Sequence, residues 1–403
     1  MIIKNIKKIK KICVSYSGGL DTSVAIKWMF DKGIKIFAYY ANIDNIKNKK
    51  LKEIKNKALK YGAYKFKMFN LKKKIAKEAI KVIKYNAFNV FSGKEKYYNT
   101  TPISRFVITK KFVKEMKKDN INIWSDGSTY KGNDIERFYL YSLKINKKIR
   151  IYKPWLDKNF IKDVGGGRKE MIKYLKKKNI LYSKEKKNYS IDSNILGNTY
   201  EGENLENLNS YLSKKHFEYK KKYKNKICSI TFKKGVPVMY NNKKIKNIVN
   251  FVIEINKIAG GYSIGISDQI ENRILGIKSR GVYESPFMEL MSILYERLAN
   301  CIHNEESLNL YRENSYKLGI ILYKGMWLSN EAIMIKSMLN VFSKRINGKI
   351  KFTFEKNKVK ILSTYSKFSL YNKKNISMEK VKNENFNYKD RIGYLNIKKL
   401  SLN

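Results

Sequence analysis

The 403-residue chain is short of cysteine, and it lacks long apolar runs. Its three cysteines, Cys13, Cys228 and Cys301, lie far apart and form no CxxC pair, which excludes a disulfide framework and a zinc ribbon. Nowhere do 18 apolar residues run together, and the basic N-terminus lacks the apolar core of an export signal. We therefore expect a cytoplasmic protein that makes no use of a membrane.

Arginine is also scarce, although the chain is strongly basic. The sequence has 86 Lys and Arg against 34 Asp and Glu, a net charge of +52, but only 10 of the basic residues are Arg. Such a charge normally favours a polyanion partner. However, Arg is the residue suited to bidentate phosphate and base contacts, and the lysines are scattered among many Asn, Ile and Tyr, the residues of A/T-rich codons. Genome composition is therefore the better explanation of the charge, and we expect no specific nucleic-acid binding.

The N-terminal part of the chain alternates strand and helix patterns. Strands are predicted over residues 12–16, 34–40, 64–70 and 121–124, and helices over 24–33, 51–61 and 103–118. This alternation predicts an α/β domain with a parallel sheet over residues 1–182. Polar loops after its strands, such as Ser125 to Thr129, then lie where such sheets bind ligands.

The pattern changes after Lys169. We predict a helix over residues 171–178, a charged linker over 183–188, a loop-rich segment up to about 208, a hairpin over 227–240, and helices over 289–298 and 311–322. These elements indicate a second, α+β domain over residues 183–375. Residues 376–403 remain as a short C-terminal arm, and the lysine-rich run 214–226 is interpreted as a solvated face.

The sharpest local signal is a nine-residue loop between the first predicted strand and helix. Its residues are Ser15, Tyr16, Ser17, Gly18, Gly19, Leu20, Asp21, Thr22 and Ser23. Two glycines let backbone N–H groups approach an anion, hydroxyls add donors, and the helix N-terminus adds positive charge. Asp21 is anomalous there unless Mg²⁺ accompanies the anion. The alternative is an ordinary turn capped by Asp21 or Thr22.

SGGLDTS is similar to the pyrophosphate loop of N-type ATP pyrophosphatases, which cleave ATP between its α and β phosphates. Five further segments narrow the resemblance: YYNTTP (97–102), NIWSDGSTYKGNDIERFY (122–139), YKPWLD (152–157), YSIDSN (189–194) and SDQIENRILGIKSRGVYE (267–284). Together they resemble argininosuccinate synthase, in particular the bacterial subgroup with YFNTTP and DGSTYKGND. The resemblance runs in order from about residue 11 to about residue 395.

The resemblance implies an adenine nucleotide alpha hydrolase-like domain followed by a synthetase domain, and an ATP-dependent carbon–nitrogen ligase. Its reaction joins L-citrulline and L-aspartate through a citrullyl-adenylate, releasing AMP and pyrophosphate, with Mg²⁺ accompanying ATP. The usual assembly is a homotetramer. No side-chain nucleophile is needed, because positioning and stabilisation of the departing pyrophosphate suffice.

The site residues implied by the resemblance fall into three groups. For ATP they are the loop Ser15 to Ser23 with Ala41, Gly127, Thr129, Asp134 and Asp192. For aspartate they are Thr129, Asn133 and Asp134. For citrulline they are Tyr97, Asn133, Arg137, Ser190, Thr199, Glu201, Glu271 and Tyr283. These residue types suit a zwitterion, since carboxylates bind its ammonium and hydroxyl or Arg groups bind its oxygens. Taken singly, each could instead be a surface ion pair or a helix cap.

The spacing of Asn133, Asp134 and Arg137 adds an independent point. The three fall on one turn at the start of a predicted helix, with Asn133 and Arg137 on the same face. Asn133 or Asp134 could simply cap that helix. A cap does not explain Arg137, because a cation near the positive end of the helix dipole is unfavourable without an anion close by. We therefore expect a ligand there.

The chain departs from the family pattern at several positions. Tyr40 stands where the family has Thr, Asp44-Asn45 replaces Gly-Gln, and Gly260-Gly261-Tyr262 lacks the family's following Arg and His. The sequence also ends soon after Arg391, where relatives continue with a longer arm. These differences put the adenine pocket and the tetramer in question, and leave the expected chemistry in place.

Two other functions remain open from the residues. A tRNA-modifying adenylase of the same loop superfamily suits the charge, although its thiolating members need a cysteine pair that is missing here. A non-catalytic nucleic-acid binder is expected to show aromatic and basic residues interleaved on one strand face, or an Arg-rich helix. Neither pattern occurs in this sequence. Pyrophosphate release from ATP with citrulline, with tRNA or with neither separates the three.

Overall fold

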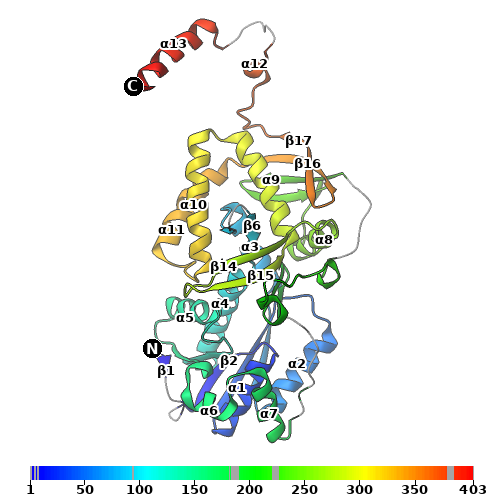
Figure 1. Ribbon diagram of the computed structural model, residues 1–403, viewed down its shortest axis with the longest axis vertical. Coiled ribbons are helices and arrows are strands. Elements are labelled where there is room, and N and C mark those ends of the chain that lie inside the picture. The colour runs from blue at the N-terminus through cyan, green and yellow to red at the C-terminus, as the bar shows by residue number, and fades with distance from the viewer. Residues whose placement is uncertain are drawn as a thin grey trace.

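The computed structural model describes residues 2–3, 6, 9–92, 95–180, 182, 190–219, 227–378 and 385–402. Figure 1 shows an elongated molecule, with the N-terminal parallel sheet and its helices at one end and antiparallel sheets and long helices at the other. The predicted fold class, an α/β N-terminal domain followed by mixed helical and antiparallel structure, is confirmed.

A six-stranded, all-parallel sheet organises the N-terminal half. Its strands, in spatial order, are β1 (Ile2–Ile3), β8 (Arg150–Tyr152), β7 (Ile123–Asp126), β2 (Lys11–Ser15), β3 (Lys35–Asn42) and β4 (Lys65–Asn70). The central strands are nearly continuous runs of apolar residues because helices cover both faces of the sheet. The strands predicted at 12–16, 34–40, 64–70 and 121–124 correspond to β2, β3, β4 and β7.

Two groups of helices cover the two faces. They are α1 (Leu20–Asp31), α2 (Asn48–Lys60), α6 (Lys158–Val164) and α7 (Arg168–Lys177) on one face, and α3 (Lys72–Lys84), α4 (Thr101–Lys118) and α5 (Asp134–Ile145) on the other. Strand residues alternate between these faces: Ile12 and Val14 pack with the first group, and Cys13 with the second. The sheet thus holds the carboxyl ends of β2, β3 and β7 in a fixed row.

Antiparallel sheets dominate the second half. The four-stranded sheet has the order β14 (Ile266–Asn272), β15 (Lys278–Glu284), β10 (Gly197–Glu201) and β9 (Ser190–Asn194). The five-stranded sheet has the order β13 (Lys243–Lys244), β12 (Val236–Tyr240), β11 (Cys228–Lys233), β16 (Gly348–Glu355) and β17 (Lys358–Tyr365). A separate hairpin pairs β5 (Asn89–Ser92) with β6 (Glu95–Tyr98).

Long helices pack against these sheets. They are α8 (Ile248–Gly261), α9 (Pro286–Ile302), α10 (Glu305–Tyr323) and α11 (Asn330–Lys344). One apolar cluster includes Phe112 of α4, Trp124 of β7 and Leu294 of α9, so the core is continuous from the parallel sheet into the second half. Within the described ranges, no helix is both long and apolar enough to span a bilayer.

The predicted hairpin over 227–240 is confirmed as β11 and β12, with Lys234 and Gly235 at positive φ in its turn. The loop-rich prediction up to residue 208 is wrong, because β9 and β10 form a hairpin there. Its strands, SIDSN and GNTYE, are polar and poor in β-formers, and β10 is held in place by pairing with β15. The predicted linker 183–188 lies outside the described residues.

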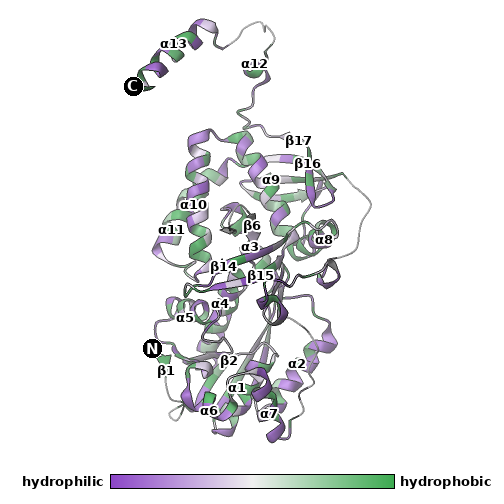
Figure 2. Cartoon of the chain, in the orientation of Figure 1, coloured by the Kyte–Doolittle hydropathy of each residue, from purple (hydrophilic) through white to green (hydrophobic). Residues whose placement is uncertain are grey.

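The C-terminal segment extends away from the rest of the molecule. Beyond β17 the chain carries α12 (Lys373–Ile376) and α13 (Tyr388–Lys399), which project from the end of the molecule in Figure 1. Figure 2 shows hydrophobic and hydrophilic residues mixed along α13, and its apolar side chains, including Ile392, Leu395 and Ile397, are exposed. Among the described residues, these side chains belong to no hydrophobic core cluster.

Candidate active site

A cavity of about 670 Å³ opens at the carboxyl ends of β2, β3 and β7, the position where α/β sheets bind ligands. Hairpin β9–β10 closes it from the opposite side. Of the residues expected to bind ATP, its walls include Ser15, Tyr16, Ser17, Asp21, Thr22, Ala41, Gly127, Asp134 and Asp192. Segments as far apart in sequence as those of Ser15 and Asp192 therefore meet around one space.

The nine-residue loop has the geometry of an anion site. Strand β2 ends at Ser15, α1 begins at Leu20, and Gly18 between them has φ +81°, a left-handed conformation that favours glycine. Gly19 occupies the N-cap position, and no side chain caps the helix. The alternative of a turn capped by Asp21 or Thr22 is therefore wrong. The first N–H groups of α1 have no partner within the helix, as in other anion-binding helix termini.

Two members of the loop face away from the cavity. Leu20 and Ser23 have buried side chains, and Ser23 Oγ lies 3.2 Å from the hydroxyl of Tyr16. The backbone N–H of Ser23 already donates to Gly19 O at 3.1 Å. Any role of Ser23 is therefore to stabilise the conformation of the loop from its buried side.

Lys57, which the sequence analysis did not select, supports the same loop. Its ammonium donates to Gly18 O at 3.0 Å, and Ile54, one turn earlier on α2, would lie 3.4 Å from a Cβ at Gly18. The face of α2 thus packs directly under the loop and brings a positive charge to it. The spacing of Ile54 and Lys57 on the predicted helix indicates that they share a face, but not that this face meets the loop.

Asp21 is the acidic group of the loop. Burial raises its pKa, which the neighbouring Arg168 lowers only in part. Among the described residues, no group of three or more His, Cys, Asp or Glu could hold a metal ion by itself. One carboxylate beside a phosphate loop does fit Mg²⁺, because Mg²⁺ commonly takes one or two carboxylates and completes its shell with substrate phosphates and water.

Two of the positions that depart from the family pattern, Tyr40 and Asp44, line the cavity. Ala41 lines it as well, and Tyr40 stacks on Phe66 with ring centroids 6.2 Å apart. Burial, with a smaller contribution from Asp44, raises the pKa of Tyr40 to about 12, so its hydroxyl stays protonated. The replacement of a small Thr by this stacked Tyr therefore changes the wall beside Ala41.

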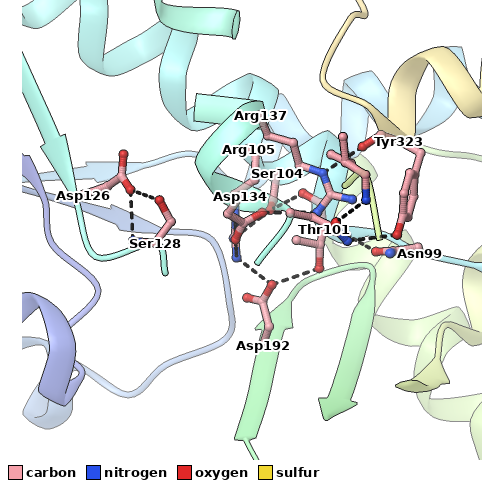
Figure 3. Close-up of polar contacts among 12 residues, drawn as sticks. Asn99, Thr101, Ser104, Arg105, Asp126, Ser128, Asp134, Arg137, Asp192 and Tyr323 are labelled. Carbon is pink, nitrogen blue, oxygen red and sulfur yellow. Dashed lines mark hydrogen bonds and ion pairs between the residues drawn. The ribbon is translucent and has the colours of Figure 1, made fainter. Parts of the chain in front are cut away.

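A guanidinium group joins the cavity to the expected citrulline residues. Arg105 of α4 donates to Asp134 at 2.8 Å and to Asp192 at 2.7 Å, and Thr101 donates to Asp192 at 2.9 Å (Figure 3). The Arg105 side chain is 14% exposed, so solvent screens these pairs little. Both carboxylates are thereby fixed in orientation. Sequence reasoning missed Arg105, although an arginine between the apolar residues Ile103 and Phe106 was a signal in so Arg-poor a chain.

The four-stranded sheet collects most of the expected citrulline residues on one face. Thr199 pairs with Asp192 on one side and with Tyr283 on the other, and Glu201 pairs with Ser190. Residues directly opposite in an antiparallel pair lie on the same face, as do residues two apart on one strand. By the same register Glu271, four residues from the partner of Tyr283, also lies on this face. The hairpin that the sequence failed to predict thus carries much of the site.

Glu271 is held by two tyrosines. Tyr97 and Tyr283 both donate their hydroxyls to its carboxylate, and their rings lie 4.7 Å apart. Burial first, and then the Glu271 charge, raises the pKa of each phenol, so both remain donors. The two hydroxyls therefore fix the orientation of the carboxylate, in contrast to the surface ion pair that its spacing alone allowed.

Arg137 and Asn133 reach across to α10. Arg137 is 2% exposed, donates from Nε to Tyr323 O at 2.8 Å and from Nη1 to Asp134 at 3.2 Å, and lies over the Tyr323 ring. Asp134 supplies the anion that Arg137 requires near the positive end of the helix dipole. The position of Arg137 on the helix therefore does not by itself indicate a ligand. Asn133 occupies the N-cap of α5 but makes no capping bond; its side chain bonds Tyr323 and Ile274 N. The capping interpretation of Asn133 is wrong.

Two buried polar atoms in this cluster are left without partners among the described residues: Nη2 of Arg137 and Oγ1 of Thr199. Leaving a buried donor unpaired costs about 1–3 kcal/mol. Both belong to residues expected to contact citrulline. Tyr323, which sequence reasoning missed, lies among them and also donates to Asn272 O at 3.0 Å.

Glu201 carries the most perturbed carboxyl of the cluster. Its side chain is exposed, and yet desolvation by the surrounding chain, with repulsion from Asp192 and Asp134, raises its pKa to about 7. The neighbouring carboxylates therefore favour an incoming cation at Glu201. An ammonium group is the cation that these residues suit.

Thr129 is one of the expected residues that lie outside the cavity lining. It is exposed, and its carbonyl accepts from Gly132 N at 3.1 Å in the turn that leads to Asn133 and Asp134. Thr129 therefore lies in the turn between Ser128, which lines the cavity, and Asn133.

Comparison with known proteins covers nearly the whole chain. A solved structure described as a predicted subunit of tRNA methyltransferase from Methanocaldococcus jannaschii is 21% identical over 44% of this chain and 94% of its own, but its TM-score of 0.28 is too low to carry an argument. Residues 11–181 match the family described as arginosuccinate synthase N-terminal HUP domain, and residues 189–403 match the arginosuccinate synthase C-terminal domain. The two matches follow each other in order and meet at the cavity, and so the chain belongs to the argininosuccinate synthase family.

Proposed function

We propose that this ATP-dependent ligase of arginine biosynthesis condenses L-citrulline with L-aspartate and releases AMP and pyrophosphate. The observation that carries the proposal is the juxtaposition of two sites. A phosphate-type loop lines one side of the cavity, and a sheet face with Thr199, Glu201 and Glu271 lies next to it. Arg105 links them through Asp134 and Asp192.

ATP occupies the cavity in this proposal, with its phosphates on the loop Ser15 to Ser23 and its adenosine beside Ala41, Gly127 and Asp192. The N-terminus of α1, which no side chain caps, and the ammonium of Lys57 supply positive potential. Mg²⁺ would be held by Asp21 together with the phosphates, and when bound it neutralises charge that develops on the departing pyrophosphate.

Citrulline occupies the sheet face. Its ammonium pairs with Glu201 and Glu271, and its carboxylate or ureido oxygen accepts from the unpartnered Arg137 Nη2 and Thr199 Oγ1. Tyr97, Ser190 and Tyr283 complete this site, and Asn133 closes it from α5. Aspartate binds at the cavity opening, between Thr129, Asn133 and Asp134.

The reaction needs two substitutions. The ureido oxygen of citrulline attacks the α-phosphorus, the bond to the β-phosphate oxygen breaks, and pyrophosphate leaves. The amine of aspartate then attacks the ureido carbon of the citrullyl-adenylate, and AMP leaves with the former ureido oxygen. The chain contributes positioning and electrostatic stabilisation, because no side chain becomes covalently attached.

Assembly and organisation belong to the same proposal. We expect a boundary near residue 182, a cytoplasmic location and a homotetramer in which residues 376–403 contact a neighbouring subunit. The exposed apolar side chains of α13 support that contact. Light scattering of the full chain and of a variant that ends at residue 375 tests it: loss of the oligomer in the shorter variant is expected, and an unchanged mass would contradict it.

The function is tested by measuring pyrophosphate release from ATP with citrulline, with tRNA or with neither, and argininosuccinate by mass spectrometry when aspartate is added. We expect release to require citrulline and product to require all three substrates. Release that depends on tRNA would favour the tRNA-modifying adenylase. Salt-dependent tRNA binding without any release would favour a nucleic-acid binder.

A further inference from the structure

A buried ion pair joins the cavity wall, at Asp126, to Lys153 behind it. Asp126 at the end of β7 and Lys153 directly after β8 are 2% and 1% exposed, and the Lys153 ammonium donates to Asp126 Oδ2 at 2.5 Å. The two strands are neighbours, with Ser125 opposite Tyr152, so the pair continues their register. Among the ion pairs between described residues for which both exposures are given, this is the most buried.

The pair controls the chain that follows β7. Asp126 Oδ1 accepts from Ser128 N at 3.0 Å and from the Ser128 hydroxyl, as Figure 3 shows, and Lys153 also donates to Ser128 Oγ at 3.2 Å. Trp124 Nε1 donates to the other Asp126 oxygen at 2.7 Å. Each oxygen of the Asp126 carboxylate therefore accepts two hydrogen bonds. Of the five contacts, all but the one from Trp124 hold Ser128 or Lys153 in place.

That turn forms part of the cavity wall. Asp126, Gly127 and Ser128 all line the cavity, and Gly127 packs against Thr22 of the phosphate loop. A small shift of Ser128 would therefore move Gly127 against the neighbouring loop or open a gap between them. Lys153 itself does not line the cavity.

Stability is a weak reason for such a pair. Removing two charges from water is costly, and apolar replacements of buried ion pairs are often neutral or stabilising. A role in fixing geometry accounts better for two buried charges whose bonds converge on one turn.

From these contacts we infer that Lys153 is a positioning residue which, through Asp126, sets the Gly127–Ser128 turn against the phosphate loop and so determines the affinity for ATP. The inference rests on the proposed binding of ATP in this cavity. Lys153 acts from outside the cavity and needs no contact with the nucleotide.

The test compares Lys153→Met with the double variant Lys153→Met/Asp126→Asn. The single variant leaves an unpaired buried carboxylate and is expected to lower both Tm and ATP affinity. The double variant removes both charges, and we expect Tm to recover in large part while the Kd for ATP stays raised by about tenfold, because the turn has lost its anchor. Calorimetry with ATP and Mg²⁺, at a temperature where circular dichroism shows each variant folded, gives the Kd.

Lys67 and Asp119 provide a matched control. This partly buried pair, 2.6 Å apart, lies away from the cavity, and Lys67→Met/Asp119→Asn is expected to leave the Kd unchanged. Recovery of ATP affinity together with Tm in the Lys153/Asp126 double variant would overturn the inference, as would an equal loss of affinity in the control. A wild-type protein that binds no ATP would instead contradict the proposed function.

Discussion

Gly127 lies so close to Thr22 that a Cβ on the glycine would come within 2.7 Å of Thr22 Cγ2. The two residues follow β7 and β2, which are adjacent parallel strands. Two loops that are 105 residues apart are therefore packed against each other with no room for a methyl group.

Gly127→Ala should weaken ATP binding with little effect on the fold, because the added methyl pushes the turn away from the phosphate loop. Overpacking of this kind costs about 1–3 kcal/mol, which corresponds to roughly 5- to 150-fold in Kd. Gly393→Ala, whose Cβ would have no neighbour within 4 Å, serves as the control and should leave the Kd unchanged. If both variants bind ATP with the same affinity, Gly127 is not part of the ATP site.

Arg105→Lys should lower kcat/KM by about 10- to 150-fold, because lysine cannot bridge Asp134 and Asp192 at once and one charge-assisted bond, about 1.5–3 kcal/mol, is lost. Arg312→Lys is the control: Arg312 bonds Glu296 from an exposed position on α10. Steady-state kinetics with each substrate varied in turn check the prediction. If both variants behave as wild type, the bridge has no role in the reaction.

Thr199→Val should raise KM for citrulline by about 5- to 10-fold, the value of one hydrogen bond. Tm should stay the same or rise, because the hydroxyl that is removed is buried without a partner among the described residues. Thr199→Ser keeps the hydroxyl and should restore KM. An unchanged KM for citrulline together with a lowered Tm in Thr199→Val would show that the hydroxyl stabilises the fold and does not bind citrulline.

Citrulline use should depend on pH through Glu201. Its pKa of about 7 means that roughly a tenth of the carboxyl is ionised at pH 6 and nine tenths at pH 8. Only the carboxylate attracts an ammonium, so kcat/KM for citrulline should rise about tenfold from pH 6 to pH 8 at saturating ATP. Glu201→Gln should flatten this rise, and a rise that persists in the variant must come from another group.

Much of the N-terminal fold could be predicted because local signals and packing agree there. Apolar runs such as Ile12 to Val14, followed by glycine turns, identified the parallel strands and the loop at Gly18. The β9–β10 hairpin could not be predicted, because its strands are polar and poor in β-forming residues where they form the face of the site. Its pairing with β15 is in addition a long-range contact.

The site residues show the same division. Motif resemblance selected Glu271 and Arg137, but it could not show that Tyr323, more than 50 residues further along the chain than Glu271, lies between them. The dipole argument for Arg137 failed for a related reason: its anion, Asp134, is supplied by the same helix turn. Contacts between distant segments are set by tertiary packing, which periodicity and spacing do not encode.

The most direct test of the account uses citrulline labelled with ¹⁸O in its ureido group. If the ureido oxygen attacks the α-phosphorus and AMP later leaves from the same carbon, one ¹⁸O per turnover must appear in AMP and none in argininosuccinate or pyrophosphate. Mass spectrometry of the three products gives the answer in one reaction with ATP, aspartate and the wild-type chain. Label in pyrophosphate, or AMP that forms without label, would contradict the proposed citrullyl-adenylate.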